Sequence, residues 1–140
     1  MSTASFVKIH VSFWLIVFVI LGISPASAQE FGYGLRVSGT LNDAEPRMVY
    51  TFTGLRGDVI AIDLSVTSGD LDPMLTLVDS VGTVVAQSDD GTTAGRGVRD
   101  LRLDSLHIPR SDQYSLIVGR FGYQLGTTSG AYSLAVDRIG

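Results

Sequence analysis

The stretch Met48-Val-Tyr-Thr-Phe-Thr-Gly-Leu-Arg-Gly-Asp-Val-Ile-Ala-Ile-Asp63 decides the fold of this chain. Apolar and polar side chains alternate in each of its halves, and a short turn with Gly57 separates the two halves. A period of two is typical of a β-strand with one buried face. We therefore predict half-buried strands over residues 47–54 and 58–66, with inward side chains Met48, Tyr50 and Phe52 in the first and Ile60, Ile62, Leu64 and Val66 in the second.

The same alternation recurs along the rest of the chain. Residues 73–79 and 83–88 flank Ser80-Val-Gly82, whose glycine permits a tight connection, so these two runs are predicted to form a hairpin. Shorter runs lie at 101–108, 114–118 and 132–136, with a weaker one at 35–37. About eight short strands at this spacing predict an all-β fold, a two-sheet antiparallel β-sandwich that is jelly-roll-like.

Two late segments repeat one another. Gln113-Tyr-Ser-Leu-Ile-Val118 and Ala131-Tyr-Ser-Leu-Ala-Val136 are offset by 18 residues. We interpret the repeat as two paired, neighbouring strands that face one core. Their tyrosine rings are predicted to be buried, with each hydroxyl reaching a partner at the sheet edge.

The first 28 residues have the pattern of an export signal. A polar start with Lys8 leads into the 13-residue apolar run Val11–Ile23, and Ala26-Ser-Ala28 offers small residues for cleavage. The run is shorter than the roughly 18 apolar residues typical of a membrane span, although a retained anchor is the alternative. We predict a signal peptide over 1–28 and one domain over 29–140, exported to the periplasm or the medium and free of the membrane after cleavage.

The composition of the predicted mature chain limits its partners. It contains nine arginines, no lysine and 14 acidic residues, so its formal charge is 9 minus 14, or −5. A net acidic domain with scattered arginines argues against a nucleic-acid partner. The chain has no cysteine, which excludes disulfides and thiolate metal sites. An exported domain of this kind favours a bacterial envelope or extracellular protein.

Five segments together resemble the bacterial pre-peptidase C-terminal domain, a β-sandwich found beside secreted peptidases. They are the stretch quoted first, Ser68-Gly-Asp-Leu-Asp-Pro-Met-Leu-Thr-Leu77, Asp79-Ser-Val-Gly-Thr-Val-Val-Ala-Gln-Ser-Asp-Asp-Gly91, and Asp112-Gln-Tyr-Ser-Leu-Ile-Val118 with Gly130-Ala-Tyr-Ser-Leu134. The resemblance implies a non-catalytic accessory domain. In some members such a domain binds calcium, and in collagenase-type members it binds the polymeric substrate. Residues 29–33 here lack the acidic cluster that collagenase-type domains use for calcium.

Four carboxylates are candidates for a metal site. The predicted hairpin brings Pro73 opposite about Ser88 or Asp89, and so gathers acids at one end of the sandwich, namely Asp70, Asp72, Asp89 and Asp90. Calcium takes six to eight oxygen ligands, which clustered aspartates supply. The structural alternative is that each aspartate caps its own turn. A calcium-binding sandwich whose loops are ordered by the ion is therefore one hypothesis, and no other cofactor is predicted.

Catalytic residues are not predicted. After signal removal His107 is the only histidine, and it alternates outward between Leu106 and Ile108, as a solvated surface residue does. Zinc chemistry lacks its histidine and cysteine ligands. A carboxylate-dependent hydrolase stays open as a minor alternative, because paired acids cannot be recognised from sequence alone.

Two glycine-rich stretches are predicted to be loops. Gly91–Gly97 lacks the lysine and hydroxyl pair of a phosphate-binding loop. The stretch 120–130 carries Arg120, Phe121 and Tyr123, which we predict to contact a ligand or protein, unless one or both rings fold back over the core. The hypothesis we favour is an exported binding or structural module that recognises a protein or polysaccharide surface, or supports a separately encoded secreted enzyme.

Overall fold

The computed structural model describes residues 28–89 and 100–140, and within them it forms nine strands and one short 3-10 helix. The elements, in chain order, are β1 (Gln29–Glu30), β2 (Arg36–Leu41), β3 (Arg47–Gly54), β4 (Val59–Val66), β5 (Pro73–Val78), β6 (Val84–Ser88), β7 (Leu101–His107), β8 (Asp112–Arg120), η1 (Tyr123–Leu125) and β9 (Gly130–Arg138). No helix in these described ranges is long and apolar enough to cross a membrane. The predicted signal segment lies almost wholly outside them.

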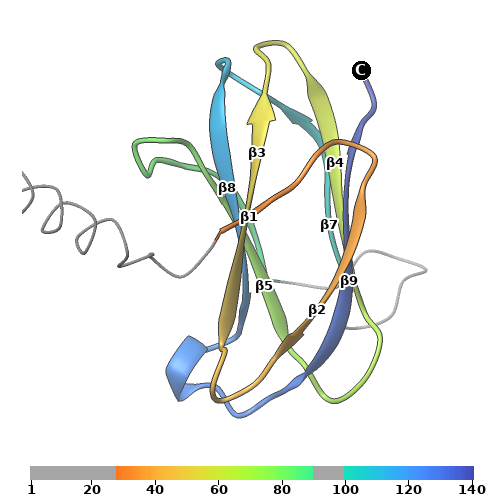
Figure 1. Cartoon of the computed structure of the whole chain (residues 1–140), viewed down its shortest axis with the longest axis vertical. Coiled ribbons are helices and arrows are strands. Elements are labelled where there is room, and N and C mark those ends of the chain that lie inside the picture. Colours follow the sequence, from red (N-terminus) through yellow and green to blue (C-terminus); the bar gives the residue numbers. More distant parts are fainter. Residues whose placement is uncertain (1–27, 90–99) are drawn as a thin grey trace, which may run out of the picture.

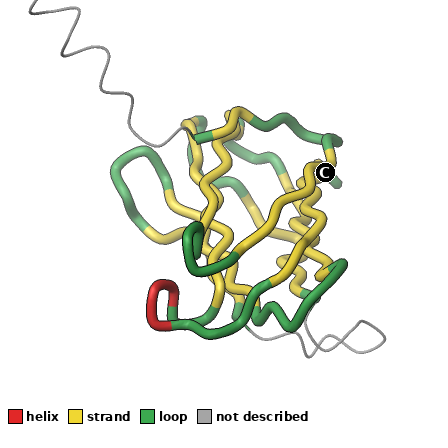
Figure 2. Tube along the Cα trace, turned by 60° about the horizontal axis from the view of Figure 1, so that its bottom comes forward, coloured by secondary structure: helices red, strands yellow, loops and turns green. Residues whose placement is uncertain are grey.

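The strands form two sheets that pack face to face (Figure 1). One sheet has the order β1-β3-β8-β5-β6, and the other has the order β2-β9-β4-β7. The loops and η1 stand at the ends of the strands, as the tube in Figure 2 shows. The predicted all-β, two-sheet sandwich is confirmed.

The strand pairing is nested in the way that defines a jelly roll. β5 pairs with β6, β4 with β7, β3 with β8 and β2 with β9, all antiparallel. The chain is thus one long hairpin rolled into two sheets. β1 is an addition to this plan: it pairs in parallel with β3, Gln29 opposite Tyr50, and its two residues are too few to show a period in the sequence.

The core lies between the sheets and is built from the inward residues of the alternating runs. Its members share nearly complete burial: Tyr50, Phe52, Ile60, Ile62, Leu64, Leu75, Leu77, Leu116, Val118, Leu134 and Val136 are among them. Met48 and Val66, also predicted to point inward, are only partly buried and pack against this core. Because the chain has no disulfide, this packing supplies most of the stability.

Two predictions about pairing were wrong. The repeated segments, now β8 and β9, do face one core, but they lie in different sheets and do not pair with each other. In the β5–β6 hairpin an irregularity near Val85 shifts the register, so that Ser88 lies opposite Leu75 instead of Pro73. Both errors have one cause: alternation fixes which face of a strand is buried, but not its neighbour or its register.

Candidate functional site

One end of the sandwich, which we call the η1 end, is formed by the connections 42–46, 67–72 and 121–129 (Figure 1, bottom). Backbone hydrogen bonds tie these connections together. Phe121 N donates to Asp72 O at 2.8 Å, and Asp70 N donates to Ser129 O at 3.0 Å. Asp72 N also donates to the Thr128 hydroxyl at 3.1 Å. The longest connection, between β8 and β9, is therefore held against the one between β4 and β5.

The side chain of Arg120 lies inside this end and holds the β8–β9 connection from within. It is 1% exposed. Its Nε donates to the Tyr123 carbonyl at 2.7 Å, and its Nη1 donates to the Thr128 carbonyl at 3.0 Å and to the Asp43 carboxylate at 2.7 Å. Arg120 was predicted to contact a ligand, but the connection curls around the guanidinium and shields it from solvent, so a direct contact stays a prediction. Arg120 is a positioning residue.

The two aromatic rings of this connection have different surroundings. Tyr123 is partly buried, and its ring lies over the β8 backbone at Gly119, where a Cβ atom would come within 2.5 Å of the ring. Phe121 is 59% exposed. One ring folds back, as the structural alternative held, and the other faces solvent. A partner contact through Phe121 stays a prediction.

An open groove of about 450 Å³ lies beside Phe121. It is lined by Asp72, Phe121, Gly122, Leu125, Gly126, Thr127 and Thr128. Leu125 is 92% exposed at its edge. Leu125 was not predicted to be a site residue. It is the single leucine in a glycine-rich stretch that lacks strand alternation. Such a pattern does not require burial, so the exposure of Leu125 could have been predicted.

Of the four predicted metal-binding acids, the described ones, Asp70, Asp72 and Asp89, follow or precede strands at this end, but the structure does not assemble these three into a site. The Asp70 carboxylate accepts a hydrogen bond from Ser129 N at 3.0 Å, and Asp72 faces the groove. Asp89 is exposed just after β6, and Asp90 lies outside the described residues. Within residues 28–89 and 100–140 no group of three or more acidic, histidine or cysteine side chains could hold a metal ion. The calcium site stays a prediction.

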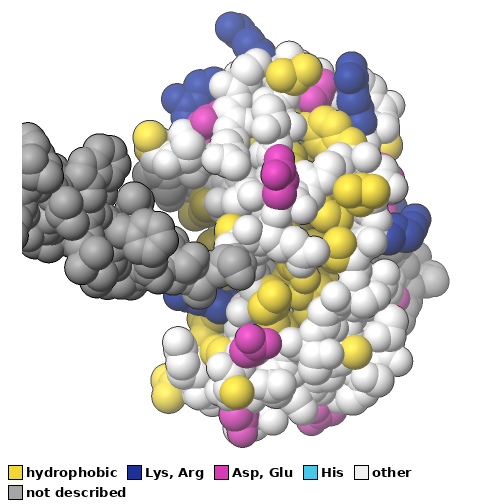
Figure 3. Space-filling model, viewed as in Figure 1, with side chains coloured by type: hydrophobic (Ala, Val, Ile, Leu, Met, Phe, Trp, Pro, Cys, Tyr) yellow, Lys and Arg dark blue, Asp and Glu magenta, His cyan; other side chains and the backbone are white. Residues whose placement is uncertain are grey.

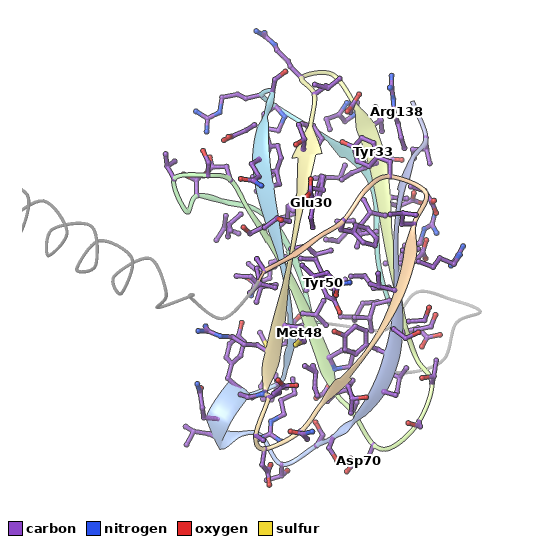
Figure 4. All side chains as sticks on the ribbon, in the orientation of Figure 1. Glu30, Tyr33, Met48, Tyr50, Asp70 and Arg138 are labelled. Atoms are coloured by element: carbon purple, nitrogen blue, oxygen red, sulfur yellow. The ribbon has the colours of Figure 1, made fainter. Side chains whose placement is uncertain are left out.

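A polar cluster at the opposite end has a structural role. The buried Asp58 carboxylate accepts hydrogen bonds from Tyr33 Oη and Leu55 N, both at 3.0 Å, and lies 3.3 Å from Arg138 Nε. Figure 4 shows Tyr33 and Arg138 together at the upper end. The bond from Leu55 N is the main reason that the pKa of Asp58 is lowered. Burial, and then the bond to Asp58, raises the pKa of Tyr33 to about 12. The cluster joins the segment before β2 and the end of β9 to the β3–β4 turn.

The tyrosine rings of the repeated segments are both buried, as predicted, and each hydroxyl has a partner. Tyr114 Oη donates to Arg110 O at 2.7 Å, in the connection before β8. The hydroxyls of Tyr132 and Tyr50 lie 2.7 Å apart in the core and not at a sheet edge, and burial is the first cause of the raised pKa of Tyr132. This second bond joins β3 and β9, which lie in different sheets.

His107 ends β7 opposite Val59 and is exposed, in agreement with the prediction of a solvated histidine. The groove combines a hollow with exposed apolar side chains, Phe121 and Leu125, on a hydrogen-bonded loop. It is the candidate binding site.

Comparison with known proteins identifies the fold. No protein-family model matches the sequence, and no curated protein matches it. The structure is similar to the pre-peptidase C-terminal domain of a collagenase from Bacillus anthracis, with a TM-score of 0.61 and 19% identity over 81% of this chain and 98% of that one. The predicted resemblance is thus confirmed at the level of the fold.

Two periplasmic inhibitors of g-type lysozyme were also found. PliG of Aeromonas hydrophila has a TM-score of 0.49 and 10% identity, over 79% of this chain and 100% of that one. PliG of Salmonella Typhimurium has a TM-score of 0.46 and 14% identity, over 81% and 100%.

Proposed function

We propose that this protein is an exported, non-catalytic binding module. Its η1 end binds the surface of a protein or polymer. The module either acts alone as a binding or structural protein or supports a separately encoded secreted enzyme. Export follows from the leader pattern of residues 1–28. The fold shared with the pre-peptidase C-terminal domain of a collagenase supports an accessory role.

The observation that carries the proposal is the way Arg120 holds Phe121 and Leu125 at the surface. The guanidinium is bonded to two carbonyls of the β8–β9 connection, those of Tyr123 and Thr128. A loop already fixed in this way loses little conformational entropy when it binds. Exposed apolar side chains on a fixed loop are also costly to leave in water, which favours a partner that covers them.

The test compares binding by the wild-type chain and by two variants, each produced with its own leader and recovered from the exported fraction. Phe121→Ser/Leu125→Ser removes the apolar groups of the groove. Val81→Ser is the matched control, because Val81 is also an exposed apolar residue on a loop, in the β5–β6 hairpin. Binding isotherms are measured on immobilised collagen, chitin, cellulose, peptidoglycan and casein, and the supernatants are assayed for released fragments.

We expect the wild type and Val81→Ser to bind at least one of these surfaces equally and to release no fragments. The double variant should bind about thirtyfold more weakly, since two apolar anchors are each worth on the order of 1 kcal/mol and about 1.4 kcal/mol is tenfold. Equal binding by all three proteins, or binding by none, would overturn the proposal. Fragment release that one Asp→Asn change abolishes would revive the carboxylate-dependent hydrolase instead.

A further inference from the structure

We infer that the partner at the η1 end is a basic segment of a protein, with aliphatic side chains that enter the groove and lysines or arginines that face its rim. This inference rests on the proposed function and adds the chemistry of the partner. It is drawn from three features of the end: its apolar centre, its acidic surroundings and the absence of an exposed cation from its described connections.

The centre of the surface is apolar. Leu125 is almost fully exposed, Phe121 is more than half exposed, and the groove continues from them past two glycines. Protein interfaces commonly have such a centre, enriched in aromatic residues, inside a polar rim. Thr127 and Thr128 supply the polar part of the groove wall.

Acidic side chains surround this centre. Asp72 lines the groove itself, and Asp70 is in the same connection. Asp43, 92% exposed, and Glu45 come from the neighbouring connection, which Arg120 joins to the groove through its bond to Asp43. In the connections 42–46, 67–72 and 121–129 there is no lysine, arginine or histidine, and the nearby Arg120 is buried. The exposed Arg47, at the start of β3, is the arginine next to these connections, so acids outnumber exposed cations around the groove.

The opposite end carries charges of both signs. Arg56, Arg110 and Arg138 are exposed there, and the last two are ion-paired with the buried Asp79 and Asp58. Figure 3 shows arginines together with acidic side chains at the upper end, and acidic side chains beside hydrophobic ones at the lower end. The acids of the upper end therefore have arginine partners, whereas those around the groove lie beside apolar side chains.

Charge complementarity selects the partner. An acidic rim attracts a basic segment over about a Debye length, roughly 10 Å at 0.1 M salt, and repels anionic polymers. An uncharged polysaccharide offers neither the cations for the rim nor aliphatic side chains for Leu125. A basic peptide segment with leucine-like side chains satisfies both parts of the surface.

The test uses four fluorescent 12-residue peptides and the exported protein, with binding followed by anisotropy in 50 mM and 300 mM salt. One peptide combines lysine and leucine, one leucine and serine, one lysine and serine, and one glutamate and leucine. Asp72→Asn removes a carboxylate that lines the groove. Glu30→Gln removes one from the exposed strand β1, away from the η1 end, and is the matched control (Figure 4). Thermal unfolding verifies that each variant is folded.

We expect the lysine–leucine peptide to bind at least tenfold more tightly than the other three in 50 mM salt, and to weaken severalfold in 300 mM salt. Asp72→Asn should lower its affinity about twofold to fivefold, as the loss of one exposed charge pair does, and Glu30→Gln should leave it unchanged.

Other results would overturn the inference in distinguishable ways. Equal binding of the lysine–leucine and leucine–serine peptides would remove the basic partner but keep the apolar groove as the binding site. Equal binding of the lysine–leucine peptide by wild type and Phe121→Ser/Leu125→Ser would show a diffuse electrostatic attraction. It would overturn the assignment of the η1 end as the binding site. If no peptide binds, the inference fails, and the immobilised surfaces decide the proposed function separately.

Discussion

Arg120 shows how one buried cation can organise a loop without forming a strong ion pair. Its acidic partner, Asp43, is almost fully in solvent, so their attraction is screened by water. The two carbonyl oxygens that it also bonds are part of the loop backbone, and without Arg120 they would lose these bonds. The contribution of Arg120 to the loop therefore comes mainly from its hydrogen bonds to carbonyls.

This balance predicts different effects for two variants. Arg120→Ala should lower the free energy of unfolding by about 2–3 kcal/mol, the usual cost of leaving buried polar groups without partners. Asp43→Asn should cost less than about 1 kcal/mol, because an exposed ion pair contributes little. Urea unfolding measures both. Equal losses would mean that the carboxylate, and not the carbonyls, holds the guanidinium.

Tyr33 predicts a change of stability with alkaline pH. Its pKa is raised to about 12 in the folded protein, whereas an unfolded tyrosine titrates near 10. A raised folded-state pKa stabilises the fold fully below pH 10, and this stabilisation is lost as the pH rises through 12. The melting temperature should therefore fall more steeply between pH 9.5 and 11.5 in wild type than in Tyr33→Phe. Parallel curves of melting temperature against pH for the two proteins would contradict this prediction. Tyr132 is present in both proteins, so its titration contributes equally to both curves.

At the scale of elements, the sequence analysis predicted the strands well and their partners poorly. Eight strands were predicted from alternation, since burial of one face imposes the period of two. The separation of β8 and β9 into different sheets was not predicted, because the alternation of a strand does not indicate which strand pairs with it. At the site, the sequence left open which of the two rings, Phe121 or Tyr123, would fold back, and the burial of Arg120 depends on carbonyls that come together only in the folded loop.

The β4–β5 connection predicts a strong effect at Gly69. Its φ of +76° favours glycine, and a Cβ atom there would lie 2.3 Å from the Ser129 carbonyl oxygen. Gly57 has a similar φ of +90° but no atom within 4 Å of such a Cβ, so it is the matched control. Gly57→Ala should cost about 1–2 kcal/mol from backbone strain alone. Gly69→Ala should cost clearly more in urea unfolding, and equal costs would mean that the two connections separate freely.

At the scale of the whole molecule, acidic side chains from three connections surround the groove while the core between the sheets is apolar. Folding sets this arrangement, because the strands carry connections from distant parts of the sequence to one end. The charge of −5 calculated for residues 29–140 argues against a nucleic-acid partner, but it could not show which acids gather at one end.

The calcium prediction belongs to this scale, since an ion at the η1 end would join several connections. It predicts that calcium added to chelator-treated protein raises the melting temperature, as any ligand specific to the folded state does. The rise should disappear in Asp72→Ala and persist in Glu30→Gln. An unchanged midpoint at millimolar calcium would contradict the prediction and leave a metal-free scaffold.

The nested pairing of the strands also constrains when the protein can fold. β9, the last strand of the sandwich in chain order, lies between β2 and β4, so the second sheet has no centre until the segment 130–138 is available. Contacts between such distant segments form slowly. A chain that has not yet formed its second sheet stays unfolded. An unfolded chain is the form that a translocation channel for extended polypeptides can transport.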